Sequence, residues 1–247
     1  MSIVKTAAAI VGCAAVLVRA DVITFDDLAH GEIVDNQYSA SNGLTISAVN
    51  LGGGPDLAAA FNTDLSGTAD PDLEGPPWAT GNLPLDTEFG NALIIAENDW
   101  GSGDGILDSP DDEGSRPAGT LVFDFDRSIS EFGFDLLDVE GPEEYGPHSG
   151  YVMTFYSEDA TMASIGFGNF ISRDGAVYGD NSINRIAPIG AADVGLSEFD
   201  YVEVNFGGSG AIDNITYTRV PEPATSALLG MGLLCLVGLF GGKRKID

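Results

Sequence analysis

Short apolar runs with a period of two residues constrain the fold of this chain more than any other feature of its sequence. In the stretch 201–206, for example, Val202, Val204 and Phe206 alternate with Tyr, Glu and Asn. A period of two places apolar side chains on one face of a β-strand, as an antiparallel sheet with one wet face requires. Between the two ends of the chain we find no competing helical period of 3.6 residues.

Nine such runs predict strands, and Gly, Pro, Asn and Asp separate them. The predicted strands are 22–25, 44–49, 92–96, 121–125, 132–136, 151–156, 162–167, 201–206 and 212–217. This pattern predicts an all-β fold, a single antiparallel β-sandwich of the jelly-roll kind, over residues 21–219. Residues 50–90 and 97–118 are rich in Gly, Pro and Asp, and we expect long loops there.

The charge of this 247-residue chain is unevenly distributed. Residues 21–220 contain five arginines, no lysine and 36 acidic residues, which gives this stretch a net charge of −31. Such a domain has no basic surface for nucleic acid or for an anionic membrane. The chain has only two cysteines, which excludes a disulfide scaffold or a Cys-rich zinc cluster. The acidic side chains of this domain repel one another, and dissolved salt or bound cations would reduce that repulsion.

The N-terminal segment 1–20 has the layout of a secretory signal peptide. Lys5 precedes an apolar run at 6–18, and the small residue Ala20 marks a plausible cleavage site. A run of this length is short for a membrane span. A buried N-terminal helix and a lipoprotein processing box ending at Cys13 are the alternatives.

The C-terminal segment 220–247 has three consecutive parts. A proline-bracketed stop, Pro221, Glu222 and Pro223, is followed by 19 uncharged residues at 224–242. As a helix, these would span roughly 28 Å, which matches the core of a bilayer and predicts a transmembrane helix. A basic tail closes the chain and is expected on the cytoplasmic side: Lys243, Arg244 and Lys245. A buried core helix is the alternative.

This order of parts resembles the PEP-CTERM sorting signal of exported bacterial proteins. The resemblance implies that an exosortase and the export machinery are partners, and that the C-terminal helix holds the protein in the inner membrane before processing. The protein would then reach the cell surface or the extracellular space. PEP-CTERM systems accompany exopolysaccharide production, so the resemblance also implies a biofilm or matrix role with exopolysaccharide as a partner. The stretches 23–27, 132–135 and 210–215 resemble β-sandwich ectodomains that such proteins carry.

Catalytic signatures are weak, and we expect no enzyme activity. The stretch 207–211 comes nearest to a nucleophile elbow, but it lacks the final glycine and precedes a predicted strand instead of a helix. With so many acids, no pair of carboxylates is informative about glycoside hydrolysis. A secreted hydrolase is therefore the least favoured of three functions. The favoured one is a non-enzymatic surface or matrix protein, and the second is a carbohydrate-binding module.

Calcium is the cofactor that the acidic loops suggest, because hard cations bind clustered oxygen ligands. One candidate is the loop from 98 to 113, with the predicted ligands Asp99, Asp104, Asp108 and Asp111. An EF-hand is excluded there, because Trp100 would occupy its first ligand position. A solvated acidic loop without metal is the alternative.

A second calcium candidate follows from strand parity and from the ends of the domain. Asp213 alternates in phase with Ile215, so a buried face there would leave its carboxylate in need of a partner. The first and last strands of a jelly roll are often adjacent, which would bring Asp26 and Asp27 close to Asp213 and Asn214. The alternative is that Asp213 caps a turn or faces solvent.

Two loop tryptophans, Trp78 and Trp100, are candidate glycan-binding residues. Aromatic rings stack on the apolar faces of sugars, but loop tryptophans also pack down as local plugs.

Overall fold

The computed structural model describes residues 19–141, 152–158 and 161–221. The predicted signal peptide up to residue 18, the motif residues Glu222 and Pro223, the predicted transmembrane helix and the basic tail lie outside the described residues. In the described part of the chain, no helix is long and apolar enough to cross a membrane.

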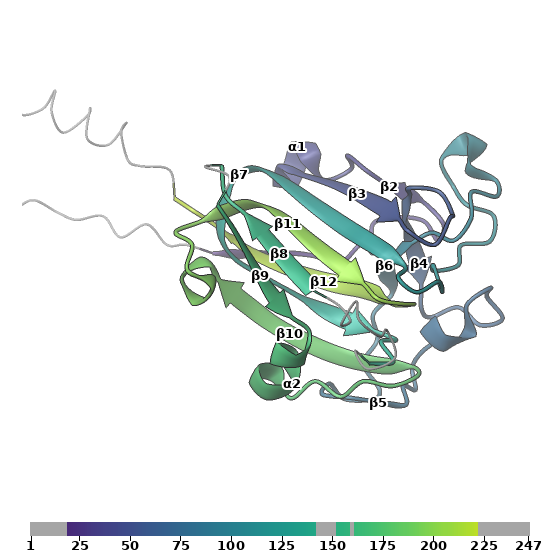
Figure 1. Ribbon diagram of the computed structural model, residues 1–247. Coiled ribbons are helices and arrows are strands. Elements are labelled where there is room, and N and C mark those ends of the chain that lie inside the picture. The colour runs from purple at the N-terminus through teal and green to yellow at the C-terminus, as the bar shows by residue number, and fades with distance from the viewer. Residues whose placement is uncertain (1–18, 142–151, 159–160, 222–247) are drawn as a thin grey trace, which may run out of the picture. The chain divides into compact units, whose positions relative to one another are not determined.

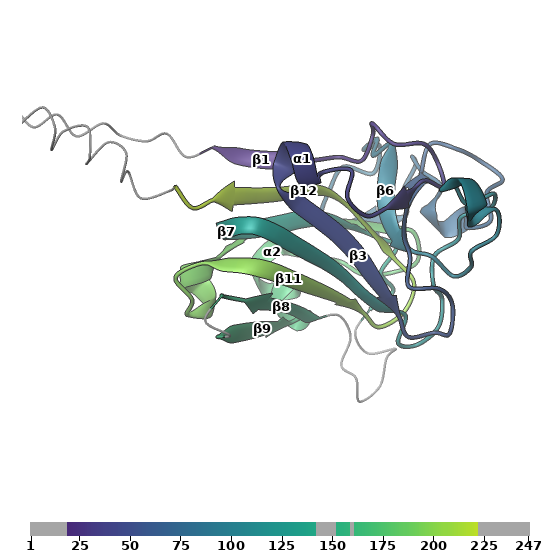
Figure 2. The same cartoon turned by 90° about the horizontal axis from the view of Figure 1, so that it is seen from above.

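Residues Ala20–Val220 form one compact unit with an all-β architecture, as the alternation predicts. Its strands are β1 (Ala20–Ile23), β2 (Ile33–Val34), β3 (Leu44–Asn50), β4 (Ala58–Asn62), β5 (Thr80–Gly81), β6 (Asn91–Ile95), β7 (Gly119–Leu137), β8 (Val152–Tyr156), β9 (Met162–Gly166), β10 (Ser182–Gly190), β11 (Phe199–Phe206) and β12 (Ala211–Arg219). The helices are α1 (Ser39–Asn42) and α2 (Gly168–Asp174), with short 3-10 turns η1 (Pro71–Leu73), η2 (Ser102–Asp104) and η4 (Ala191–Val194). Figures 1 and 2 show the arrangement.

The long strand β7 belongs to two sets of pairings and joins them into a sandwich. Its first part, 119–125, lies between β3 and β11, and β11 continues to β8 and β9. Its second part, 129–137, lies between β10 and β12. Next to β12 follow β6, β4 and β2, while β1 pairs with the other end of β12. These pairings are antiparallel, and among the strands that the structure describes only the short β5 pairs in parallel, with β10.

The two parts of β7 face each other across the main core. The ring centroids of Phe123 and Phe132 are 5.3 Å apart, and those of Phe125 and of Tyr217 on β12 are 4.9 Å apart. Phe134, Val202 and Ile186 complete this contact between the two sets of strands. The main core therefore fills the space between the layers, as in a β-sandwich.

A smaller outer cluster lies on the opposite face of β4 and β6. It contains Phe61, Trp78, Phe89, Ile94 and Leu137. The loops that follow β4 fold back over this face, so β4 is buried on both sides. Its sequence, Ala-Ala-Ala-Phe-Asn, consequently shows no alternation, and the expectation of one long loop over 50–90 is wrong there.

Candidate metal centre

Three carboxylates, Asp70, Asp111 and Asp112, meet beside the outer cluster. One carboxylate oxygen from each lies within 4.8 Å of the others. Asp70 and Asp112 are each 6% exposed, and Asp111 is half-buried. Carboxylate oxygens at this spacing repel one another in a poorly solvated place, so the group needs protons or a cation.

Asp70 is oriented by the 3-10 turn that it begins. Its Oδ1 accepts the backbone N–H groups of Asp72 at 3.1 Å and Leu73 at 3.3 Å. Pro71 follows at the first position of the turn, where its missing N–H costs nothing. Leu73 anchors the turn in the outer cluster. With Oδ1 engaged in this way, Oδ2 is buried and has no hydrogen-bond partner in the described residues.

Asp111 and Asp112 are held against the end of β6 by a short bridge. The N–H of Glu97 donates to the carbonyl of Asp111 at 3.0 Å, and Ala96 pairs with Asp112. The Asp112 side chain accepts the N–H of Gly210, in the turn between β11 and β12. The centre thus connects the η1 turn, the end of β6 and the β11–β12 turn.

The surrounding pocket is lined mostly by acidic residues and has a volume of about 280 Å³. Its lining contains no Lys or Arg, and the acids are Asp70, Asp72, Glu97, Asp111, Asp112 and Asp138. Burial raises the pKa of Asp70, and it raises the pKa of Asp112 well above its usual value, with the charge of Asp70 adding to the effect. Burial also raises the pKa of Asp138 to about 7. An oxygen-lined, negatively charged pocket of this kind suits a hard divalent cation.

Of the four acids predicted in the loop from 98 to 113, only Asp111 belongs to this group. Asp99, Asp104 and Asp108 are exposed, and Asp104 Oδ1 accepts the N–H of Ile106 at 3.1 Å. These three do not join any group of metal-binding geometry among the described residues. Asp70 and Asp112 were not predicted. The Asp-Pro start of a turn at Asp70 signals a capping aspartate, but it does not signal a ligand.

The ends of the domain meet as predicted, because β1 pairs with β12 and Ile23 lies opposite Ile215 (Figure 2). Asp213 is fully buried, and its Oδ1 has no hydrogen-bond partner in the described part of the chain. Burial raises the pKa of Asp213 to about 9, and the charges of Asp135 and Asp26 contribute.

The parity argument for Asp213 is wrong, however, because β12 has a bulge. Asn214 has a φ of 50°, and the register with β7 shifts between Asp213 and Thr216. Ala211 therefore contributes to the outer cluster, whereas Ile215 contributes to the main core. Asp213 lies opposite Asp135, which pairs with Arg185.

The other residues of this predicted site already make hydrogen bonds within the protein. Asp27 accepts the hydroxyl of Tyr38 at 2.7 Å. The amide nitrogen of Asn214 donates to Asp213 Oδ2 at 2.9 Å and to Asp135 Oδ2 at 3.0 Å. Asp26 Oδ1 accepts the N–H of Asn91 at 3.1 Å. Asp26 and Asp213 belong to no group of metal-binding geometry among the described residues, so calcium at this junction stays a prediction.

The two tryptophans have opposite environments. Trp78 is 3% exposed, its indole N–H donates to the carbonyl of Thr87 at 2.8 Å, and its ring packs against Phe89. Its prediction as a glycan platform is wrong, because the ring is part of the outer cluster. Trp100 is 67% exposed, so stacking on a sugar stays a prediction for this residue alone.

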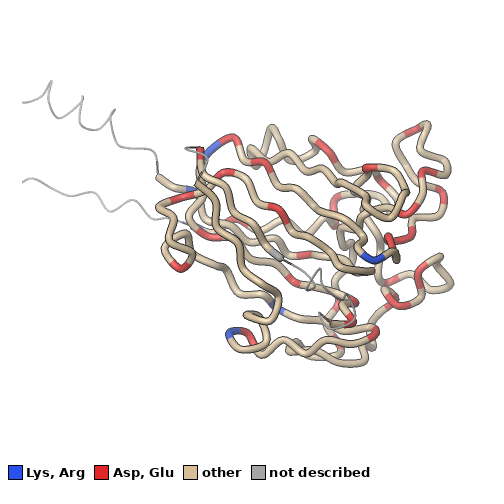
Figure 3. Tube along the Cα trace, in the orientation of Figure 1, with Lys and Arg blue, Asp and Glu red and all other residues tan. Residues whose placement is uncertain are grey.

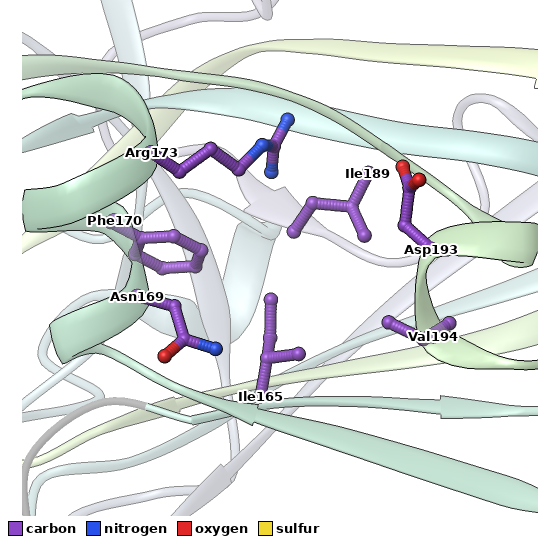
Figure 4. A pocket seen from close by; sticks show the side chains of 7 residues that line it. All are labelled: Ile165, Asn169, Phe170, Arg173, Ile189, Asp193 and Val194. Carbon is purple, nitrogen blue, oxygen red and sulfur yellow. The ribbon is translucent and has the colours of Figure 1, made fainter.

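A separate pocket of about 340 Å³ lies between β9, α2, β10 and η4 (Figure 4). Ile165, Ile189 and Val194 give it an apolar lining. Its charged side chains make hydrogen bonds to nearby backbone groups. Arg173 donates to the carbonyls of Ala187 and Pro188, and Asp193 accepts the N–H of Gly190. These contacts stabilise the backbone and do not indicate a ligand.

The comparisons with known proteins concern the C-terminal end and, more distantly, the domain. No curated protein matches the chain. Among solved structures, the K2 cleaved adhesin domain of Lys-gingipain is similar at 12% identity, covering 81% of this chain and 98% of that one, with a TM-score of 0.36. That likeness is too distant to support an inference.

The match to a known family is local but specific. Residues 219–245 match the PEP-CTERM protein-sorting motif, at the position that the proline-bracketed stop and the basic tail predict. This motif implies processing by an exosortase and export to the cell surface. The chain therefore carries a PEP-CTERM sorting signal after its all-β domain.

Proposed function

We propose that this protein is a non-enzymatic component of the bacterial cell surface or of the extracellular matrix. The observation that carries the proposal is the sorting motif at 219–245, directly after the last strand of a single acidic domain. A lysine-free domain with a net charge of −31 suits surroundings that supply salt and divalent cations, as an exopolysaccharide matrix does.

Structural calcium belongs to the same proposal. The junction of β1 and β12 is one place for it, because Asp213 Oδ1 is buried without a hydrogen-bond partner among the described residues, and burial, with the charges of Asp135 and Asp26, raises the pKa of Asp213. A cation at this junction would offset the buried charge and hold the first and last strands together. The last strand leads directly into the sorting segment, so this junction lies at the boundary between the folded domain and that segment.

The sorting step is tested by replacing Pro221, Glu222 and Pro223 with alanine in the full chain, in the organism that makes it. The altered protein should keep its C-terminal tail and stay in the membrane fraction, with most of the surface-exposed form lost. A matched control replaces Thr225 and Ser226, which also lie within the matched segment, with alanine and leaves Pro221, Glu222 and Pro223 in place. Surface display of the motif variant at the wild-type level would contradict the proposal.

A further inference from the structure

We propose that Asp70, Asp111 and Asp112 bind one calcium ion, which fastens the η1 turn, the end of β6 and the β11–β12 turn to one another. The site is separate from the β1–β12 junction and does not depend on how the protein is sorted.

The orphaned oxygen of Asp70 is the first support for this site. Asp70 is 6% exposed, and its Oδ2 has no N–H or hydroxyl donor among the described residues; the neighbouring Asp112 carboxyl can donate to Asp70 only while it is protonated. The same side chain lines the acidic pocket and lies within 4.8 Å of its two neighbours. A buried carboxylate oxygen without a donor is costly, and a bound cation would remove that cost.

The positions of the three ligands are fixed by contacts that involve no metal. Asp70 is held by its two hydrogen bonds to η1, and Asp111 and Asp112 by the bridge to Ala96 and Glu97. The N–H of Gly210 holds one oxygen of Asp112. Because the backbone already brings these groups together, little conformational entropy remains to be lost when an ion binds.

The chemistry of the pocket favours calcium over magnesium or a transition metal. The side-chain ligands that the pocket offers are oxygens, from carboxylates and the hydroxyl of Ser209, and neither His nor Cys is among the described residues that line it. Calcium accepts six to eight oxygens in irregular geometry, whereas magnesium demands an octahedron and keeps its waters. Glu97 and Asp138 line the same pocket and supply further negative charge.

Asp70→Asn is the decisive variant, because it should fold. Asparagine caps a helical turn as well as aspartate does, so the bonds to Asp72 and Leu73 remain. Its amide nitrogen can also donate to the Asp112 carboxylate, which removes the need for a cation. We expect the wild-type full chain, purified in mild detergent and stripped with EGTA, to bind calcium in calorimetric titrations and to gain in Tm. In Asp70→Asn, the calcium affinity of one binding event should fall at least about tenfold. The Tm of this variant in EGTA should be unchanged or higher than that of the wild type.

Asp104→Asn is the matched control. Asp104 is an exposed acid of the neighbouring loop, outside the group, and asparagine preserves its bond to the N–H of Ile106. This control should titrate like the wild type, and Asp213→Asn should keep the event that Asp70→Asn loses. The proposal is overturned if the wild type does not bind calcium, if Asp70→Asn binds it unchanged, or if magnesium gives the same response. None of these readouts depends on export, so a failure here leaves the sorting proposal intact.

Discussion

The backbone conformation of Asn214 changes which face of β12 the preceding side chains point to. Its φ of 50° inserts a bulge into β12 and separates Asp213 from the alternation of Ile215 and Tyr217. Asp213 is then buried beside Asp135 and Arg185, with one oxygen unpartnered. Asn tolerates this conformation better than most residues do, but an Asp-Asn pair alone does not predict a bulge.

The raised pKa of Asp213 predicts how stability depends on pH. Its folded value of about 9 lies above the ordinary value of 3.8, so the folded state holds a proton that the unfolded state has released between these pH values. In EGTA, the free energy of unfolding should therefore fall as pH rises through this window. Millimolar calcium should reduce the loss in the wild type.

Asp213→Asn should be more stable than the wild type in EGTA at pH 8, by about 1–3 kcal/mol, and should lose this part of the pH dependence. Denaturant unfolding at pH 5 and pH 8 measures both effects. Equal pH dependence of the two proteins would show that Asp213 does not carry it.

The candidate site shows what local sequence can and cannot reveal about ligands. Asp111 is predictable because it lies in a loop rich in acids. Asp70 and Asp112 come together only through the bridge between Ala96 and Asp112 and through the folding of η1 onto the outer cluster. Neither contact leaves a signal in the spacing of acidic residues.

At the scale of elements, β7 organises the sandwich. The sequence predicts two strands, 121–125 and 132–136, and the structure joins them into one strand that pairs with β3 and β11 and then with β10 and β12. The register shift between Phe199 and Tyr201 on β11 marks where β7 bends. Sequence alternation finds the two straight parts but does not report that they are continuous.

The bend of β7 places Phe132 at the centre of the main core, where it contacts Phe123, Phe125 and Phe134. Phe132→Ala should therefore cost about 3–5 kcal/mol of stability, because the cavity would open between the two layers. The midpoint of denaturant unfolding, at constant m-value, measures the loss. Val22→Ala, at an exposed position of β1, is the control and should change stability by less than about 0.5 kcal/mol. A loss below about 1 kcal/mol for Phe132→Ala would contradict this account of the core.

Four strands of the described domain are not predicted from the sequence, and each lacks the alternating pattern for a physical reason. β4 is buried on both faces and has no polar side to alternate. β10 contains Pro188, which argues against a strand, and the structure accommodates it in the register shift between Ile186 and Ile189. β2 and β5 have two residues each, too few for any period.

At the scale of the whole molecule, the described domain is acidic and carries few basic residues (Figure 3). Acidic residues lie on loops and strands in many parts of the domain, and every lysine of the chain lies outside residues 21–220. This division fits a protein whose basic residues serve sorting and whose domain functions among cations outside the cell. The sorting motif at 219–245 implies processing, so we expect the exported form to lack the C-terminal segment.

Mass spectrometry of the C-terminal peptide of the protein released from the cell surface shows whether this segment has been removed. We expect a surface form that ends at or shortly after Pro221–Pro223 and lacks Lys243, Arg244 and Lys245. A surface form that is intact to Asp247 would contradict this expectation.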